Sequence, residues 1–125
     1  MASKPRILTV DRNQRNLELL AQFLNKEGYE TVAVSTLEDF NQILAQVDSF
    51  GIALVDISGF DRHIWEYCEK LSTQDVPLLI LSPPQVKAIQ QESLAHGAQG
   101  VVFKPLIIKE FSNLIRAMIR DEHHE

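Results

Sequence analysis

The chain has only one cysteine, Cys68, and no excess of basic residues. A single cysteine excludes a disulfide within the chain, and the apolar neighbours Ile64, Trp65 and Leu71 favour a buried thiol over a reactive one. With 12 Lys and Arg against 17 Asp and Glu, the formal net charge is -5. This balance argues against broad attraction to nucleic acid or to an anionic membrane. We therefore expect the partner to be a protein or a small molecule.

Long apolar runs are also missing. The stretch from Met1 to Arg6 has no hydrophobic segment of the kind that directs export, and no later run is long enough to cross a bilayer. This predicts a cytoplasmic location. The 125 residues contain no linker, repeat or low-complexity stretch, and their number is typical of one domain. The sequence therefore predicts a single domain over residues 1–125.

Five short apolar runs alternate with five segments of helical pattern. The runs are Ile7 to Val10, Thr31 to Val34, Ile52 to Val55, Leu78 to Leu81 and Val101 to Phe103. Most of them are apolar almost throughout, which is typical of strands covered on both faces. Strands that alternate with helices predict an α/β domain in which crossover helices connect the strands of a parallel sheet.

The predicted helices are marked by apolar residues at helical spacing and by residues that cap or end helices. They are Leu17 to Leu24, ended by Gly28; Leu37 to Val47, capped by Ser35 or Thr36; Ile64 to Leu71; Pro84 to His96, ended by Gly97; and Phe111 to Met118.

Polar residues follow four of the predicted strands. Asp11 and Asp56 come after the first and third runs, Ser82 after the fourth, and the fifth runs into Lys104. Because ligands of open parallel sheets bind at the carboxyl ends of the strands, we expect these four side chains to converge. Structural roles stay open for some of them: Asp11 or Ser82 as a helix cap, and Lys104 as a counter-ion. A purely structural Asp56 is harder to explain, since a polar group at the end of a central apolar strand is costly.

The sequence resembles the receiver domains of bacterial response regulators over essentially its whole length. The matching segments are Ile7-Leu8-Thr9-Val10-Asp11, Ala53-Leu54-Val55-Asp56, Leu79-Ile80-Leu81-Ser82, Gly97-Ala98 and Lys104-Pro105. The resemblance implies a flavodoxin-like, doubly wound (βα)₅ fold with five parallel strands in the order 2-1-3-4-5. It also implies a signalling module of two-component or phosphorelay systems, not an enzyme, and we expect no output domain.

The resemblance assigns a role to each residue at the strand ends. Asp56 would be the phosphoacceptor, Ser82 would bind the phosphoryl group, and Lys104 would neutralise its charge. Asp11, Asp56 and the backbone carbonyl of Ser58 would hold Mg²⁺, which prefers oxygen ligands. The Lys104-Pro105 bond matches one that is cis in the family.

The resemblance also implies the partners. A histidine kinase or a phosphotransfer protein would supply the phosphoryl group, and a downstream protein would receive the signal. The contact surface would comprise the fourth helix, the fifth strand and the fifth helix, and the same surface is a candidate for a homodimer interface.

Two positions close to the site depart from the family pattern. Arg12 stands where a second acid is usual, so Arg12 and Lys104 would balance the charge of Asp11 and Asp56 and leave Mg²⁺ weakly bound. The alternative is that Arg12 turns into solvent. Pro83 stands where a backbone N–H usually binds the phosphoryl group, and proline has none.

Further departures affect signalling. Val101 takes the place of the family's switch aromatic, for which Phe103 is a weak substitute. Asp61 is either a substitute acid or a solvated loop residue, and Ile107 and Ile108 are either core residues or part of a docking surface.

Two other functions remain open. One is an atypical receiver that acts as a phosphorylation-independent interaction module. The other is a small flavodoxin-like enzyme or cofactor carrier, although no glycine-rich phosphate loop follows the first strand.

Overall fold

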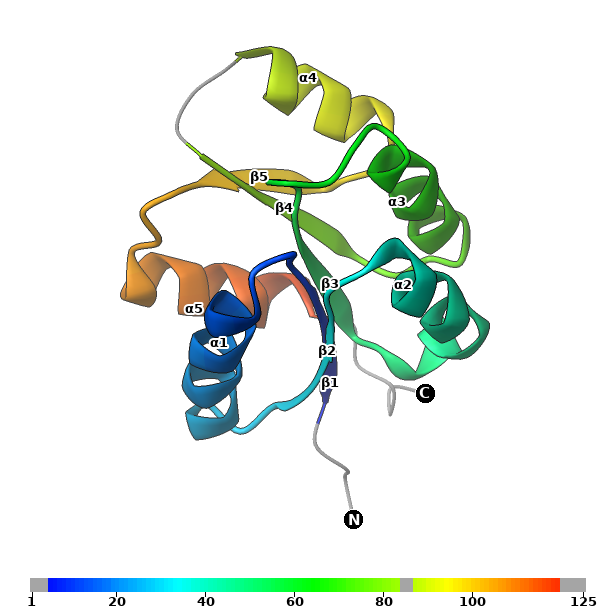
Figure 1. Ribbon diagram of the computed structural model, residues 1–125. Helices are drawn as coiled ribbons and strands as arrows, with labels where there is room; N and C mark the ends of the chain where they lie inside the picture. The colour runs from blue at the N-terminus through cyan, green and yellow to red at the C-terminus, as the bar shows by residue number, and fades with distance from the viewer. Residues whose placement is uncertain (1–4, 84–86, 120–125) are drawn as a thin grey trace.

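A five-stranded parallel sheet forms the centre of the molecule (Figure 1). The computed structural model describes residues 5–83 and 87–119. The strands lie in the order β2-β1-β3-β4-β5, as the sequence predicted. The elements are β1 (Arg6–Val10), α1 (Gln14–Lys26), β2 (Glu30–Val34), α2 (Leu37–Ile43), η1 (Leu44–Ser49), β3 (Ile52–Asp56), α3 (Ile64–Thr73), β4 (Leu78–Ser82), α4 (Lys87–Ala95), β5 (Gly100–Phe103) and α5 (Ile108–Met118).

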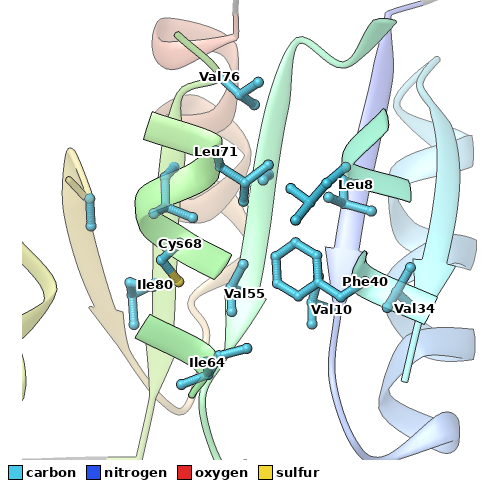
Figure 2. Close-up of a cluster of buried hydrophobic side chains, with 14 of the residues drawn as sticks. Leu8, Val10, Val34, Phe40, Val55, Ile64, Cys68, Leu71, Val76 and Ile80 are labelled. Carbon is cyan, nitrogen blue, oxygen red and sulfur yellow. The ribbon is translucent and has the colours of Figure 1, made fainter. Parts of the chain in front are cut away.

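Helices cover both faces of the sheet. Figure 1 shows α1 and α5 side by side on one face, and α2, α3 and α4 on the other. Successive residues of each strand point to opposite faces, so each strand contributes to two cores. Leu8, Val10 and Val55 pack with Phe40 and Cys68 on the side of α2 and α3 (Figure 2).

The second core fills the space between the sheet and the pair α1 and α5. Ile7 and Leu54 from the strands pack there against Leu24 of α1 and Phe111 and Ile115 of α5. All five of these side chains are at most 2% exposed. The apolar periodicities that predicted α1 and α5 therefore mark the faces that these two helices bury.

The strands differ in burial according to their place in the sheet. The three central strands β1, β3 and β4 are buried along nearly their whole length, whereas β2 and β5 at the edges are half-buried. Coverage on both faces therefore holds for the central strands, whose ends carry three of the candidate site residues.

The second helix is shorter than predicted. Residues 37–43 are α-helical, but a 3₁₀-helix replaces the expected last turn, and Gln46 within it leaves the helical conformation. Leu44 and Phe50, at either end of this stretch, are both buried in the same core. Helical spacing alone could not predict the change from α-helix to 3₁₀-helix. The change depends on the burial of Phe50 in the core before β3 begins. Thr36 rather than Ser35 caps α2, since its Oγ1 accepts the N–H of Asp39 at 3.1 Å.

The glycines predicted to end helices do so. Gly28 after α1 and Gly97 after α4 have φ values of +96° and +98°, in the region that favours glycine. The predicted start of the fourth helix at Pro84 lies outside the described residues. No described helix combines the length and the apolar character needed to cross a membrane.

Candidate functional site at the carboxyl ends of the strands

Four polar residues lie at the carboxyl edge of the sheet, as expected from the strand ends. Asp11 directly follows β1, Asp56 ends β3, Ser82 ends β4, and Lys104 directly follows β5. Asp56, Ser82 and Asp11 are only 1%, 2% and 8% exposed. The three strands β1, β3 and β4 are neighbours in the sheet, and this order brings residues from distant parts of the sequence to one edge.

Asp56 is held from both sides. Its Oδ1 accepts the backbone N–H of Ser58 at 2.9 Å, and its Oδ2 forms an ion pair with the ammonium group of Lys104. The Lys104 backbone N–H donates to the carbonyl oxygen of Ser82 at 2.8 Å, which ties the end of β5 to that of β4. The Ser58 hydroxyl is buried and meets no hydrogen-bond partner within the described residues.

Asp11 is buried next to Asp56 and does not cap the first helix. Its Oδ1 accepts the N–H of Asn13 at 2.8 Å, whereas the N-cap of α1 is Asn13, which accepts the N–H of Asn16. Burial raises the pKa of Asp11 above its ordinary value, and the charge of Asp56 raises it further. The Asp11 carboxylate is therefore poorly solvated when it is charged. A cation placed beside it would compensate for the lost solvation.

Ser82 ends β4 at the same edge of the sheet, and its Oγ donates to the carbonyl oxygen of Pro83 at 3.0 Å. Its alternative role as a cap of the fourth helix depends on residues outside the described part of the chain. The cis Lys104-Pro105 bond is present as expected.

Arg12 lies outside this pocket. Its side chain is exposed, and its guanidinium carbon lies 5.7 Å from the ring centroid of Phe60 in the β3–α3 loop. The expectation that Arg12 balances the pocket charge is therefore wrong, because stacking on Phe60 leaves its charge in water. Asp11, Asp56 and Lys104 together leave one formal negative charge in the pocket.

Asp61 does not replace the missing acid. It is exposed, and its Oδ1 accepts the backbone N–H of His63 at 2.9 Å. The same oxygen lies 3.0 Å from Nδ1 of the His63 ring. The hydrogen bond from the His63 backbone lowers the pKa of Asp61. The interpretation as a solvated loop residue is the one the structure supports.

A cavity that the sequence did not predict adjoins the site. Its volume is about 250 Å³, and it lies between α1 and α5 with Asp11, Asp56 and Lys104 on its lining. Leu19, whose side chain is 46% exposed, lines it as well. The signal in the sequence was the pair Leu19-Leu20, which extends the apolar face of α1 beyond the buried stripe.

The sequence pattern of the response regulator receiver domain matches residues 7–116. The chain belongs to this family. The match spans all five strands and the four polar residues of the site, so the predicted fold and family are both confirmed.

Curated relatives of this receiver include two regulators at 28–29% identity. The heme response regulator HssR of Staphylococcus saprophyticus is 28% identical over 90% of the chain and 50% of its own length. The transcriptional regulatory protein HprR of Escherichia coli is 29% identical over 94% of the chain and 53% of its own length. The chain thus spans about half the length of these relatives.

Solved structures also resemble this receiver. A CheY-like receiver domain protein from Methanospirillum hungatei has a TM-score of 0.78 at 27% identity and covers 92% of this chain and 93% of its own. The Vibrio cholerae chemotaxis protein CheY4 has a TM-score of 0.78 at 20% identity, with 94% and 100% covered. The second likeness supports the fold alone.

Family membership fixes the general role of this receiver. Receiver domains are signalling domains rather than typical enzymes, and they exchange signals with histidine kinases or phosphotransfer proteins and with output targets. They typically bind Mg²⁺ at the acidic pocket.

The aromatic switch position of this receiver is occupied by Val101, which packs against the core beside α3. Phe103 is half-buried and lines a smaller cavity of about 120 Å³ with Ile107, Phe111 and Leu114. It therefore lies against the start of α5, and its use as a switch stays a prediction.

Proposed function

We propose that this receiver takes a phosphoryl group on Asp56 from a histidine kinase or phosphotransfer protein and passes the signal on through protein contact. The observation that supports the proposal best is the buried Asp56 carboxylate, which faces the Lys104 ammonium group and has Ser82 at the end of the next strand. A buried carboxylate that is paired with a lysine and placed at the edge of the sheet is a suitable nucleophile for phosphorus.

The transfer needs three things from these residues. A carboxylate oxygen of Asp56 attacks the phosphorus atom, and the bond between phosphorus and the donor nitrogen breaks, with its electron pair leaving on the donor. The Lys104 ammonium group then offsets charge on the phosphoryl oxygens, and the Ser82 hydroxyl turns from the Pro83 carbonyl to donate to one of them. Pro83 itself has no N–H to contribute.

The donor set fits a weakly held Mg²⁺. Asp11, Asp56 and the Ser58 carbonyl would hold the ion, and the pocket's single net negative charge favours a cation. When bound, the ion neutralises charge on the phosphoryl oxygens. The described residues contain no group of three acidic, histidine or cysteine side chains that could hold a metal ion, so we expect weaker binding than in receivers with a second acid after β1. Calorimetry that gave tight binding to the unmodified protein would contradict this.

An intact-mass spectrum after treatment with acetyl phosphate and Mg²⁺ tests the proposal. We expect one added phosphoryl group that base removes, and none in the Asp56→Asn variant. Asp61→Asn is the matched control, because this Asp lies exposed outside the pocket, and it should be modified like the parent. Equal labelling of Asp56→Asn and the parent would reject Asp56 as the acceptor.

A phosphorylation-independent interaction module is the second candidate. Pro83 favours it, because the missing N–H removes a donor whose loss costs roughly 2 to 4 kcal/mol of transition-state stabilisation in comparable sites. An unmodified parent protein in the same spectrum would favour this second function. A colourless purified protein would argue against a flavin or cobalamin carrier. The stand-alone organisation and the cytoplasmic location stay predictions.

A further inference from the structure

The cavity beside the acidic site has apolar walls and a charged end. Its walls include Leu20 and Phe23 of α1 and Leu106 and Phe111 of the β5–α5 region. The rings of Phe23 and Phe111 stack with centroids 6.1 Å apart. Figure 1 shows how α1 and α5, which supply these walls, run side by side over the sheet.

The charged end has a definite sign. Lys104 forms its ion pair with Asp56 and acts on Asp11 only as a more distant charge, so the carboxylate of Asp11 forms no ion pair with a residue that lines the cavity. Its hydrogen bond from the Asn13 N–H is the contact of a turn and supplies no full charge. A buried carboxylate without a counter-ion is costly, so a cation is favoured here and a second anion is disfavoured.

The size of the cavity limits what it can hold. A protein interior has few voids larger than a water molecule, and a dry apolar cavity of roughly 150 Å³ holds one benzene molecule. A cavity of about 250 Å³ therefore has room for one ring with a short arm. Leu19 and Ile108 also line it and are 46% and 56% exposed, so its rim reaches the surface.

We propose that this cavity binds a small organic cation, with an apolar or aromatic body between α1 and α5 and an ammonium group beside Asp11. The body replaces water against the leucine and phenylalanine walls, and the ammonium group offsets the Asp11 charge. The inference does not rest on phosphorylation of Asp56, because binding needs only the cavity and the unmodified carboxylates.

Three probes of one shape and different charge test the proposal by NMR titration of the ¹⁵N-labelled protein in Mg²⁺-free buffer. They are phenethylamine, phenethyl alcohol and hydrocinnamate. We expect saturable shifts in α1 and α5 with the amine, and an affinity for the amine at least about tenfold above that for the alcohol. Hydrocinnamate should give no saturable shifts.

Two matched leucine variants locate the site. Leu19→Lys places a positive charge and a polar head at the cavity, and should weaken binding of phenethylamine by about tenfold. Leu94→Lys makes the same change on α4, where the leucine is 51% exposed and does not line the cavity. It should bind phenethylamine like the parent. Both positions are exposed, so both variants should keep the parent's melting temperature.

A third variant tests the charge. Asp11→Asn keeps an oxygen for the Asn13 N–H but removes the negative charge, so the amine should lose its advantage over the alcohol. The proposal is overturned if no probe saturates, if the alcohol or hydrocinnamate equals the amine, or if the shifts lie outside α1 and α5. Equal effects of Leu19→Lys and Leu94→Lys would overturn it as well.

Discussion

Arg12 shows at the scale of one residue that charge in a sequence does not give charge in a site. It directly follows Asp11, yet its guanidinium group lies over Phe60. Its aliphatic stem lies beside Gly59, where a side-chain Cβ, if present, would be 3.3 Å from the Arg12 Cγ. The pocket therefore lacks an acid but gains no cation. Replacing Arg12 with alanine and replacing it with an acid should therefore have different effects on the affinity for Mg²⁺.

We predict that Arg12→Asp raises the affinity for Mg²⁺ by about tenfold or more, because it adds a carboxylate ligand. The control Arg12→Ala should stay within about twofold of the parent, because the arginine charge is screened by water. Calorimetry measures both. A rise in Arg12→Ala that matched Arg12→Asp would show that arginine repulsion, not the missing ligand, limits binding.

Pro83→Ala, added to Arg12→Asp, should increase phosphorylation of Asp56 again. Alanine restores a backbone N–H next to Ser82, and one such donor is worth about 10²-fold or more in comparable sites. The rate of mass gain with acetyl phosphate is the measurement. If the folded double variant were labelled no faster than the parent, Arg12 and Pro83 would not be what limits the site.

Asp11 should make stability depend on pH. Its pKa is raised in the folded protein, so the folded state binds the proton more tightly than the unfolded chain does. The free energy of unfolding therefore falls as the pH rises from the unfolded pKa near 3.8 through the higher folded value. We predict that, at pH 7 without Mg²⁺, Asp11→Asn melts a few degrees above the parent. The difference in melting temperature should disappear below the pKa of Asp11 in the unfolded chain. A difference that stayed constant with pH would contradict this origin.

At the scale of elements, α4 is fastened to α3 by contacts at its end. The ring of His96 stacks on Trp65 with centroids 5.3 Å apart, and its Nδ1 contacts Glu69 of α3. Arg62, which precedes α3, donates to Glu92 of α4 at 2.6 Å. These contacts involve side chains from both helices, so the position of α4 depends on α3 as well as on the sheet.

Gly97 makes this contact possible, and Gly28 provides a matched comparison. Both have positive φ, but a Cβ at Gly97 would lie 2.4 Å from Ser72 of α3, whereas a Cβ at Gly28 would meet nothing within 4 Å. We predict that Gly28→Ala costs about 1 to 2 kcal/mol from backbone strain alone. Gly97→Ala should cost at least about 1 kcal/mol more because of overlap. Urea unfolding measures both, and equal costs would show that α4 moves freely away from α3.

At the scale of the whole molecule, most of the exposed large apolar side chains lie on α4 or at the start of α5. Of the four exposed large hydrophobics in the described structure, Leu94, Ile107 and Ile108 lie on α4 or at the start of α5. The interpretation of Ile107 and Ile108 as core residues is therefore wrong, since they are 58% and 56% exposed. Their positions agree with the expected contact surface of α4, β5 and α5.

We predict a concentration-dependent homodimer through this surface. Ile107→Lys should shift the protein toward the monomer in sedimentation velocity, because a charge replaces exposed apolar area at the interface. Leu19→Lys, an equivalent change on α1, should leave the dimer intact. A parent protein that stayed monomeric at every concentration measured would contradict the homodimer and leave a downstream protein as the expected partner.

The sequence by itself determined the order and type of the elements, the parallel sheet and the residues at its carboxyl edge. It could do so because apolar runs and strand-end positions are local patterns. Asp56 and Lys104 were identified this way although they are far apart in the chain and β4 lies between their strands, since all parallel strands of one sheet end at the same edge.

Only the tertiary structure decided where long or exposed side chains lie and what lies between packed helices. It turned Arg12 toward Phe60, exposed Ile107, shortened α2, and left the cavity between α1 and α5. These features depend on contacts between residues that are distant in sequence. The position of a flexible arginine side chain and the presence of a cavity leave no periodic pattern in the sequence.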